Sequence, residues 1–160
     1  MSAESDLKKF QAKINKALDQ FSSNESLQSI GDFTADIIKR RSRLGYGVPV
    51  DGGPKAKFQE LAESTKKARN SKKLSAETSP NKSNLTETGQ LLNDIVAKIK
   101  GRETIIGHTK DRNKKIGAFH QTGGGNLPQR RYLGLAKEDQ KQRAARLQDI
   151  FNDILNKLFK

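Results

Sequence analysis

Apolar residues recur at helical spacing in two runs near the start of the chain. In residues 6–21 they stand three or four positions apart, with lysines between them. Ser22-Ser23-Asn24 interrupts the pattern, and a second run over residues 27–38 closes in basic residues, a typical helix ending. The pattern predicts two helices, or one broken helix, in an N-terminal helical region over residues 1–45. We expect the apolar stripe of residues 6–38 to pack in the core, because so polar a chain has little apolar surface to spare.

The helical periodicity disappears between residues 46 and 84. Glycines and prolines punctuate the start of this segment, and Phe58, Leu61 and Ala62 are consistent with a short helix. The stretch from residue 66 to 73 is basic and carries no large apolar side chain. A connection of this length without structure is unusual inside a compact domain, unless it is a functional arm. We therefore predict an extended basic loop or arm over residues 46–84.

Regular structure is predicted to resume at residue 85. Ile95, Ala97 and Ile99 alternate with other residues ahead of Gly101, which predicts a hairpin around that glycine. Further along the chain, the pattern favours a short helix over residues 111–121, stopped by Gly123-Gly124-Gly125, and a short strand over residues 131–135.

The final segment has the clearest pattern. Apolar residues from Leu147 to Phe159 fall at steps of three and four, with charged residues opposite them. The helix is predicted to start near Lys137-Glu138-Asp139, where acids face the positive end of its dipole. The fold class is therefore α+β: a small antiparallel sheet flanked by the N-terminal helices and a long C-terminal amphipathic helix. Residues 85–160 hold the sheet and this helix, and the chain forms a single domain overall.

Composition narrows the possible functions. The chain has 160 residues, a formal net charge of +13 and no cysteine. Such a charge favours contact with polyanions, whether nucleic acid, acidic protein surfaces or anionic lipid, although simple solvation also explains many lysines. Disulfides and thiolate metal sites are excluded. No apolar run approaches the roughly 20 residues that span a bilayer. The polar N-terminus has no signal-peptide core, so we expect no membrane association and a cytosol-like compartment.

The residue types of a catalytic centre are sparse. His108 and His120 stand on different predicted elements without metal-ligand spacing, and no serine lies in a Gly-x-Ser-x-Gly pattern. The glycine run 123–125 lacks the lysine and hydroxyl of a phosphate loop, so it is interpreted as a turn that holds Arg130 and Arg131 outward. A Ser-His-Asp arrangement of distant residues stays open at this point. We expect no catalytic, cofactor-binding or metal site, and an enzyme is the least favoured hypothesis.

Basic side chains gather in two stretches that are candidates for facing a polyanion. These residues are Lys66, Lys67, Arg69, Lys72, Lys73, Lys98, Lys100 and Arg102. The stretches lack the aromatic residues on which bases stack, and no helix-turn-helix, zinc-finger or RNA-recognition signature is present. A nonspecific nucleic-acid-binding module is therefore the alternative function, and sequence-specific DNA binding is not expected.

The C-terminal half carries an ordered series of short motifs. Ile116-Gly117-Ala118-Phe119-His120-Gln121-Thr122-Gly123-Gly124 is followed by Leu127-Pro128-Gln129-Arg130-Arg131-Tyr132-Leu133-Gly134-Leu135 and then by Glu138-Asp139. This series resembles the phage virion-morphogenesis or tail-completion family. The upstream piece Leu85-Thr86-Glu87-Thr88-Gly89-Gln90-Leu91 is similar to the family's leucine, two residues, Thr-Gly-x-Leu step, and residues 53–68 resemble its linker. The likeness covers roughly residues 50–145.

The resemblance implies a non-enzymatic structural role. Members of this family are small α+β subunits that assemble as rings, commonly hexamers, at the head-proximal end of the tail or in the head–tail joint. The expected partners are further copies of the chain and other phage neck, tail or connector proteins, with nonspecific contact to passing DNA. The expected location is the virion at the head–tail junction, after assembly in the host cytoplasm. In such a ring, Arg130, Arg131 and Tyr132 are expected at a subunit or partner contact.

Overall fold

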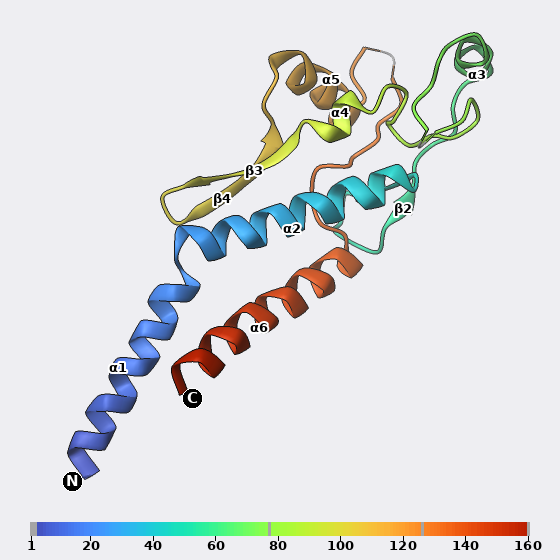
Figure 1. Ribbon diagram of the computed structural model, residues 1–160. Coiled ribbons are helices and arrows are strands. Elements are labelled where there is room, and N and C mark those ends of the chain that lie inside the picture. Colours follow the sequence, from blue (N-terminus) through green and yellow to red (C-terminus); the bar gives the residue numbers. More distant parts are fainter. Residues whose placement is uncertain (1–2, 77, 126, 160) are drawn as a thin grey trace.

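Long helices and short antiparallel ribbons make up the computed structural model, which describes residues 3–76, 78–125 and 127–159 (Figure 1). The helices are α1 (Ala3–Phe21), α2 (Asn24–Arg43), α3 (Glu63–Asn70), α4 (Gln90–Asn93), α5 (Asp111–Thr122) and α6 (Lys137–Phe159). The ribbons pair β1 (Tyr46–Gly47) with β2 (Ala56–Lys57), and β3 (Ile95–Lys100) with β4 (Glu103–His108). The predicted α+β class is confirmed.

Helices α1 and α2 are separate, and a serine cap sets the break between them. The backbone N–H of Ser26 donates to Oγ of Ser23, the N-cap of α2, at 3.2 Å. The Ser26 hydroxyl in turn donates to the carbonyl oxygen of Gln20, near the end of α1, at 2.9 Å. Because these polar side chains satisfy the free helix ends, the chain bends here, and α1 extends away from the rest of the molecule (Figure 1).

Helix α2 is the central element of the fold. It packs against the β3–β4 hairpin and against α6, and its residues Ala35 and Ile38 join the core cluster. The hairpin approaches α2 closely at Gly31, where an added Cβ would lie 2.7 Å from the Cβ of Ala97. The other members of the core cluster come from the loops and from the segment after residue 84: Phe58, Leu92, Ile95 and Tyr132.

The predicted hairpin is confirmed, whereas the strand predicted over residues 131–135 is wrong. Lys100 pairs with Glu103 around Gly101, which has a φ of 61°. In the 131–135 segment the backbone donors of Tyr132 and Leu133 bind the Gln121 side-chain oxygen, at 2.6 and 3.2 Å. These donors are therefore not free to join a strand ladder.

The segment predicted as an extended basic loop or arm, residues 46–84, is mostly loop in the structure, with a few short elements. This segment contains the β1–β2 ribbon and helix α3, and both Phe58 and Leu61 are buried. Two hydrogen bonds attach the segment to the end of α2. The N–H of Phe58 donates to the carbonyl oxygen of Gly45 at 2.8 Å, and the Asn84 side chain donates to the carbonyl oxygen of Arg43 at 3.1 Å. The helix considered around Phe58 starts later, at Glu63.

Helix α6 confirms the C-terminal prediction and packs against both α1 and α2. Its contacts with α1 include Phe10 against Phe159 and Phe21 against Phe151, with ring centroids 5.6 and 5.4 Å apart. The expectation of core packing for residues 6–38 holds for α2 but only partly for α1, because a single partner helix covers one side of α1. No helix in the described ranges combines the length and apolarity that crossing a bilayer requires.

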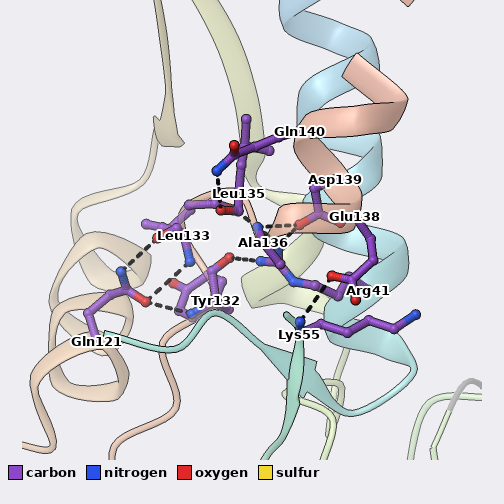
Figure 2. A network of polar contacts seen from close by, with 11 residues as sticks. Arg41, Lys55, Gln121, Tyr132, Leu133, Leu135, Ala136, Glu138, Asp139 and Gln140 are labelled. Atoms are coloured by element: carbon purple, nitrogen blue, oxygen red, sulfur yellow. Dashed lines mark hydrogen bonds and ion pairs between the residues drawn. The ribbon is translucent and has the colours of Figure 1, made fainter. Parts of the chain in front are cut away.

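The start of α6 is fixed to α2 by a buried ion pair between Arg41 and Asp139 (Figure 2). The Arg41 guanidinium also donates to the carbonyl oxygens of Gly134 and Tyr132. Asp139, the third residue of α6, reaches back and accepts the N–H of Ala136 at 2.9 Å, as an N-terminal capping carboxylate does. One side chain of α2 therefore holds both the 132–134 segment and the start of α6.

We predict that Arg41→Met destabilises the fold by about 3–5 kcal/mol, because it leaves the Asp139 carboxylate buried without its counter-charge. The matched control is Arg40→Met, which removes an exposed arginine from the same turn and should change the free energy of unfolding by less than about 0.5 kcal/mol. Urea denaturation of both variants checks this expectation. Equal stability of the two variants would show that the ion pair is dispensable.

Candidate functional site

The motifs that carry the family resemblance hold one another in place. The side chain of Gln121, in α5, donates to the carbonyl oxygen of Leu133 at 3.0 Å while its oxygen accepts the N–H groups of Tyr132 and Leu133 (Figure 2). The glycine turn begins at Gly123, which has a φ of 77°, and it returns the chain so that the N–H of Arg130 donates to His120 at 2.7 Å. The first role of these motifs is therefore architectural.

This return of the chain corrects the prediction for Arg130, Arg131 and Tyr132. The side chain of Tyr132 is completely buried in the core, and Arg130 is only 6% exposed, so neither lies on an open surface where two subunits would pack face to face. Arg131 is half-buried, and its carbonyl oxygen accepts the N–H of Val48 at 2.8 Å. Of the three residues, Arg131 alone retains an exposed side for a partner contact.

A buried polar cluster surrounds His108, at the end of β4. Its Nε2 lies 2.5 Å from the hydroxyl of Tyr132, and its Nδ1 lies 3.7 Å from a carboxylate oxygen of Asp94. Asp94 also accepts the backbone N–H of Lys110 and the Asn113 side chain, both at 3.0 Å. The cluster joins the hairpin to the start of α5, and within the described residues no serine hydrogen-bonds to either histidine.

The charges in this cluster are settled by its burial and hydrogen bonds. Burial alone would raise the pKa of Asp94, but hydrogen bonds from Thr109, Lys110 and Asn113 outweigh it and hold the pKa at about 2. Burial lowers the pKa of His108, and the nearby Asp94 charge offsets only part of this effect. An ionised aspartate and a neutral histidine, both shielded from solvent, make this cluster a structural support.

A cleft of about 1200 Å³ lies beside α5. Its walls come from residues 59–69, from residues 83–91, from α5 and from the segment after the glycine turn. Three arginines line it: Arg69, Arg112 and Arg130. We call this feature the Arg130 cleft. It is the described cavity in which most positive charge gathers, and its walls come from two regions of the chain, residues 59–91 and residues 112–130.

The two buried arginines of the Arg130 cleft are positioned by backbone oxygens and a hydroxyl. Arg130 donates from Nε to the Ser83 hydroxyl at 3.1 Å and from Nη2 to the Gln59 carbonyl oxygen at 3.4 Å. Arg69, which is also 6% exposed, donates from Nη1 to the Lys82 carbonyl oxygen at 2.9 Å. Burial and the charge of Arg69 both lower the pKa of Arg130.

His120 lines the same cleft beside Arg130. Burial, together with the charge of Arg130, lowers its pKa from 6.5 to about 4, so the imidazole is neutral at physiological pH. Its Nδ1 is buried and has no hydrogen-bond partner among the described residues. The cleft therefore combines fixed positive charge with a neutral imidazole whose Nδ1 has no hydrogen-bond partner among the described residues.

The structure separates the predicted polyanion-facing residues into paired, buried and exposed ones. Arg69 is buried, which corrects its assignment to a polyanion-facing surface. Lys66 pairs with Glu63 at 2.7 Å and Lys72 with Glu87 at 3.0 Å, whereas Lys67 and Lys73 are exposed. Three residues are exposed on the β3–β4 hairpin, and among the described residues none of them has a carboxylate within ion-pair distance: Lys98, Lys100 and Arg102.

Comparisons with protein-family models, with curated proteins and with solved structures give no match for this chain. The geometry of metal binding is not found either: in the ranges that the structure describes, no three His, Asp or Glu side chains group as a metal site would require. What the structure itself shows at the site is a cleft lined by three arginines and, beside it, a buried polar cluster that packs α5.

We predict that His120 makes stability fall in acid. Its folded-state pKa is depressed, so its contribution is complete above pH 6.5 and is lost as the pH falls from 6.5 toward about 4, where the unfolded chain binds the proton first. The variant His120→Gln should lose less stability than the wild type across this window. Urea denaturation at about pH 7 and about pH 4.5 measures the difference. Parallel losses in the two proteins would contradict the assignment.

Proposed function

We propose that this chain is a non-enzymatic structural protein of a tailed-phage particle. In this proposal it is a tail-completion, terminator or neck subunit that forms a ring, hexameric as is common in the family, at the head–tail junction. Its partners are other copies of itself and neighbouring neck, tail or connector proteins. The ordered motifs between residues 85 and 139, which resemble the virion-morphogenesis family, support this proposal.

The observation that carries the proposal is the uncovered apolar side of α1. Leu7, Phe10 and Leu18 are 65%, 54% and 51% exposed on a helix that extends away from the body (Figure 1). We call these three residues the α1 stripe. Burying a large apolar side chain stabilises by roughly 1.5–3 kcal/mol, so covering the stripe supplies a substantial driving force for association.

A second copy of the chain is the occupant that this surface favours. The α1 stripe continues directly into the contact with α6, since Phe10 packs on Phe159, which is itself 41% exposed. A neighbouring copy that extended this helix pair would cover both exposed rings. Contacts between two different faces of identical subunits close into a ring when the rotation from one copy to the next completes a full turn about one axis.

The bonding of the buried polar groups is compatible with a structural role. Asp94, His108 and Tyr132 fill the interior around α5, and Arg41 and Asp139 neutralise one another between helices. Each of these polar groups is used to hold an element in place. We therefore propose that the protein performs no chemical reaction.

The alternative function, nonspecific nucleic-acid binding, is favoured by one specific observation. The hairpin presents Lys98, Lys100 and Arg102 as exposed, unneutralised cations near its tip. Such residues bind phosphates without reading sequence. Within a ring, the same hairpin would make the DNA contact expected for a neck protein, so the two functions are compatible.

We predict that Leu7→Ser with Leu18→Ser keeps the protein monomeric while its helical content is unchanged, because the apolar area that drives association is lost. Sedimentation velocity compares this double variant with the wild type. The matched control is Lys16→Ser with Asp19→Ser, which alters two exposed residues outside the stripe at constant net charge. The interface assignment fails if the apolar variant assembles as the wild type does.

We predict that replacing Lys98, Lys100 and Arg102 by glutamine weakens duplex DNA binding and reduces the slope of log affinity against log salt by about 2 to 3. The control variant replaces Lys66 and Lys72 by glutamine. Glu63 and Glu87 already offset the charges of these lysines, so this variant should change the slope less. A fluorescence-anisotropy salt titration checks both variants. Absence of binding by the wild type at low salt would refute the alternative function.

A further inference from the structure

The Arg130 cleft carries more positive charge than its own acids neutralise. The carboxylates in its walls are Glu60 and Glu87. Glu87 is shared between Lys72 at 3.0 Å and Arg69 at 3.6 Å, and Glu60 lies 4.0 Å from Lys66. In the described part of the chain, no carboxylate lies within ion-pair distance of Arg130. The cleft therefore has an unmatched guanidinium in a buried position.

The bonding of Arg130 leaves part of its guanidinium for a ligand. Its hydrogen bonds to Ser83 and Gln59 use Nε and Nη2, and among the described residues none accepts a hydrogen bond from Nη1. The Nε of Arg69, opposite Glu87, is buried with no hydrogen-bond acceptor. The two guanidinium groups are close enough for the charge of one to lower the pKa of the other. Glu87 offsets the charge of Arg69, but no carboxylate of the described residues offsets that of Arg130, so an anion bound beside Arg130 would reduce the repulsion between the two guanidinium groups.

The walls of the cleft distinguish between kinds of anion. Around the arginines lie seven apolar residues: Leu61, Ala62, Leu85, Leu91, Ile116, Leu127 and Pro128. A nucleic-acid backbone is contacted by exposed cations such as those on the hairpin, and it has no apolar groups to place against such walls. The volume of about 1200 Å³ exceeds the roughly 300–1,000 Å³ of small-molecule pockets. Both features fit a short peptide segment with apolar and acidic side chains.

We propose that the Arg130 cleft binds an extended peptide segment of a partner protein through an acidic side chain flanked by apolar residues. The carboxylate would lie between Arg130 and Arg69, where the planar guanidinium fork matches its two oxygens. The flanking apolar side chains would contact Leu61 on one wall and Leu127 on the other. This assignment stands whether or not the chain forms a ring.

His120 supplies a readout inside the cleft. The charged groups that line the cleft with it are Arg69, Arg112, Arg130, Glu60 and Glu87. A bound carboxylate beside Arg130 would offset the positive charge that now disfavours the imidazolium. Binding of an acidic peptide should therefore raise the pKa of His120, and a neutral peptide should not.

The test follows the His120 imidazole signal by NMR during pH titration of the full chain. The probe is the acetylated and amidated peptide Ala-Leu-Glu-Leu-Ala, and the matched control has glutamine in place of glutamate. The proposal expects the glutamate peptide to raise the His120 pKa and the control to leave it unchanged. An oligothymidylate of about eight nucleotides tests whether the cleft arginines bind nucleic acid instead.

Two variants connect the effect to the cleft. Arg130→Lys keeps the charge but not the fork, and should weaken binding of the glutamate peptide by at least about tenfold. Arg112→Gln, at an exposed rim position, should fold as the wild type and weaken binding by a smaller factor. The proposal is overturned if the two peptides act alike, if only the oligothymidylate shifts His120, or if neither Arg130→Lys nor Arg112→Gln weakens binding.

Discussion

The guanidinium of Arg41 is the contact on which the arrangement of the fold depends. Three segments of the chain meet at this side chain. Helix α2 supplies the arginine, the 132–134 segment supplies two carbonyl oxygens and α6 supplies Asp139 (Figure 2). Arg41 reaches these three acceptors from two nitrogens held apart in a planar fork, whereas a lysine would have to reach all three from a single nitrogen. With α6 fixed at its start, its far end is placed beside α1, so the assembly surface proposed on α1 depends on a buried ion pair at the opposite end of the helix.

Arginines and lysines occupy different environments in this protein. Arg41, Arg69 and Arg130 are buried and bind backbone oxygens, whereas most lysines face solvent and several pair with nearby acids. Among the described residues three arginines and two aspartates are buried, so nearly all of the net charge of +13 lies on side chains that are exposed or half-buried. Three of the exposed cations lie together on the hairpin, and a buried guanidinium without a matching acid lies in the Arg130 cleft. The two regions suit different anions, because one is open and polar and the other is enclosed and partly apolar.

Elements with a strong local pattern could be predicted from the sequence. The 3.6-residue spacing gave the two N-terminal helices and α6, and alternation around Gly101 gave the hairpin, because each pattern reports one face of one element. The prediction of a strand over residues 131–135 was wrong because of a contact between distant residues. The side-chain oxygen of Gln121 on α5 accepts the backbone N–H groups that a strand would need. The loop of residues 46–84 looked unstructured because it is polar, yet its polar residues Arg69 and Asn84 are among those that anchor it. The cleft was missed since its walls come from distant segments, although the Arg130-Arg131 pair beside the glycine turn marked one of them.

The central claim, that the chain is the repeating subunit of a ring, is tested most directly by native mass spectrometry of the full chain. The protein should be measured over a range of concentrations, alone and with purified tail-tube subunits. The account predicts one closed species at a fixed multiple of the 17.8 kDa chain, six copies if the ring is of the common size, with no larger ladder of masses. A protein that remains at the mass of a single chain under both conditions would contradict it.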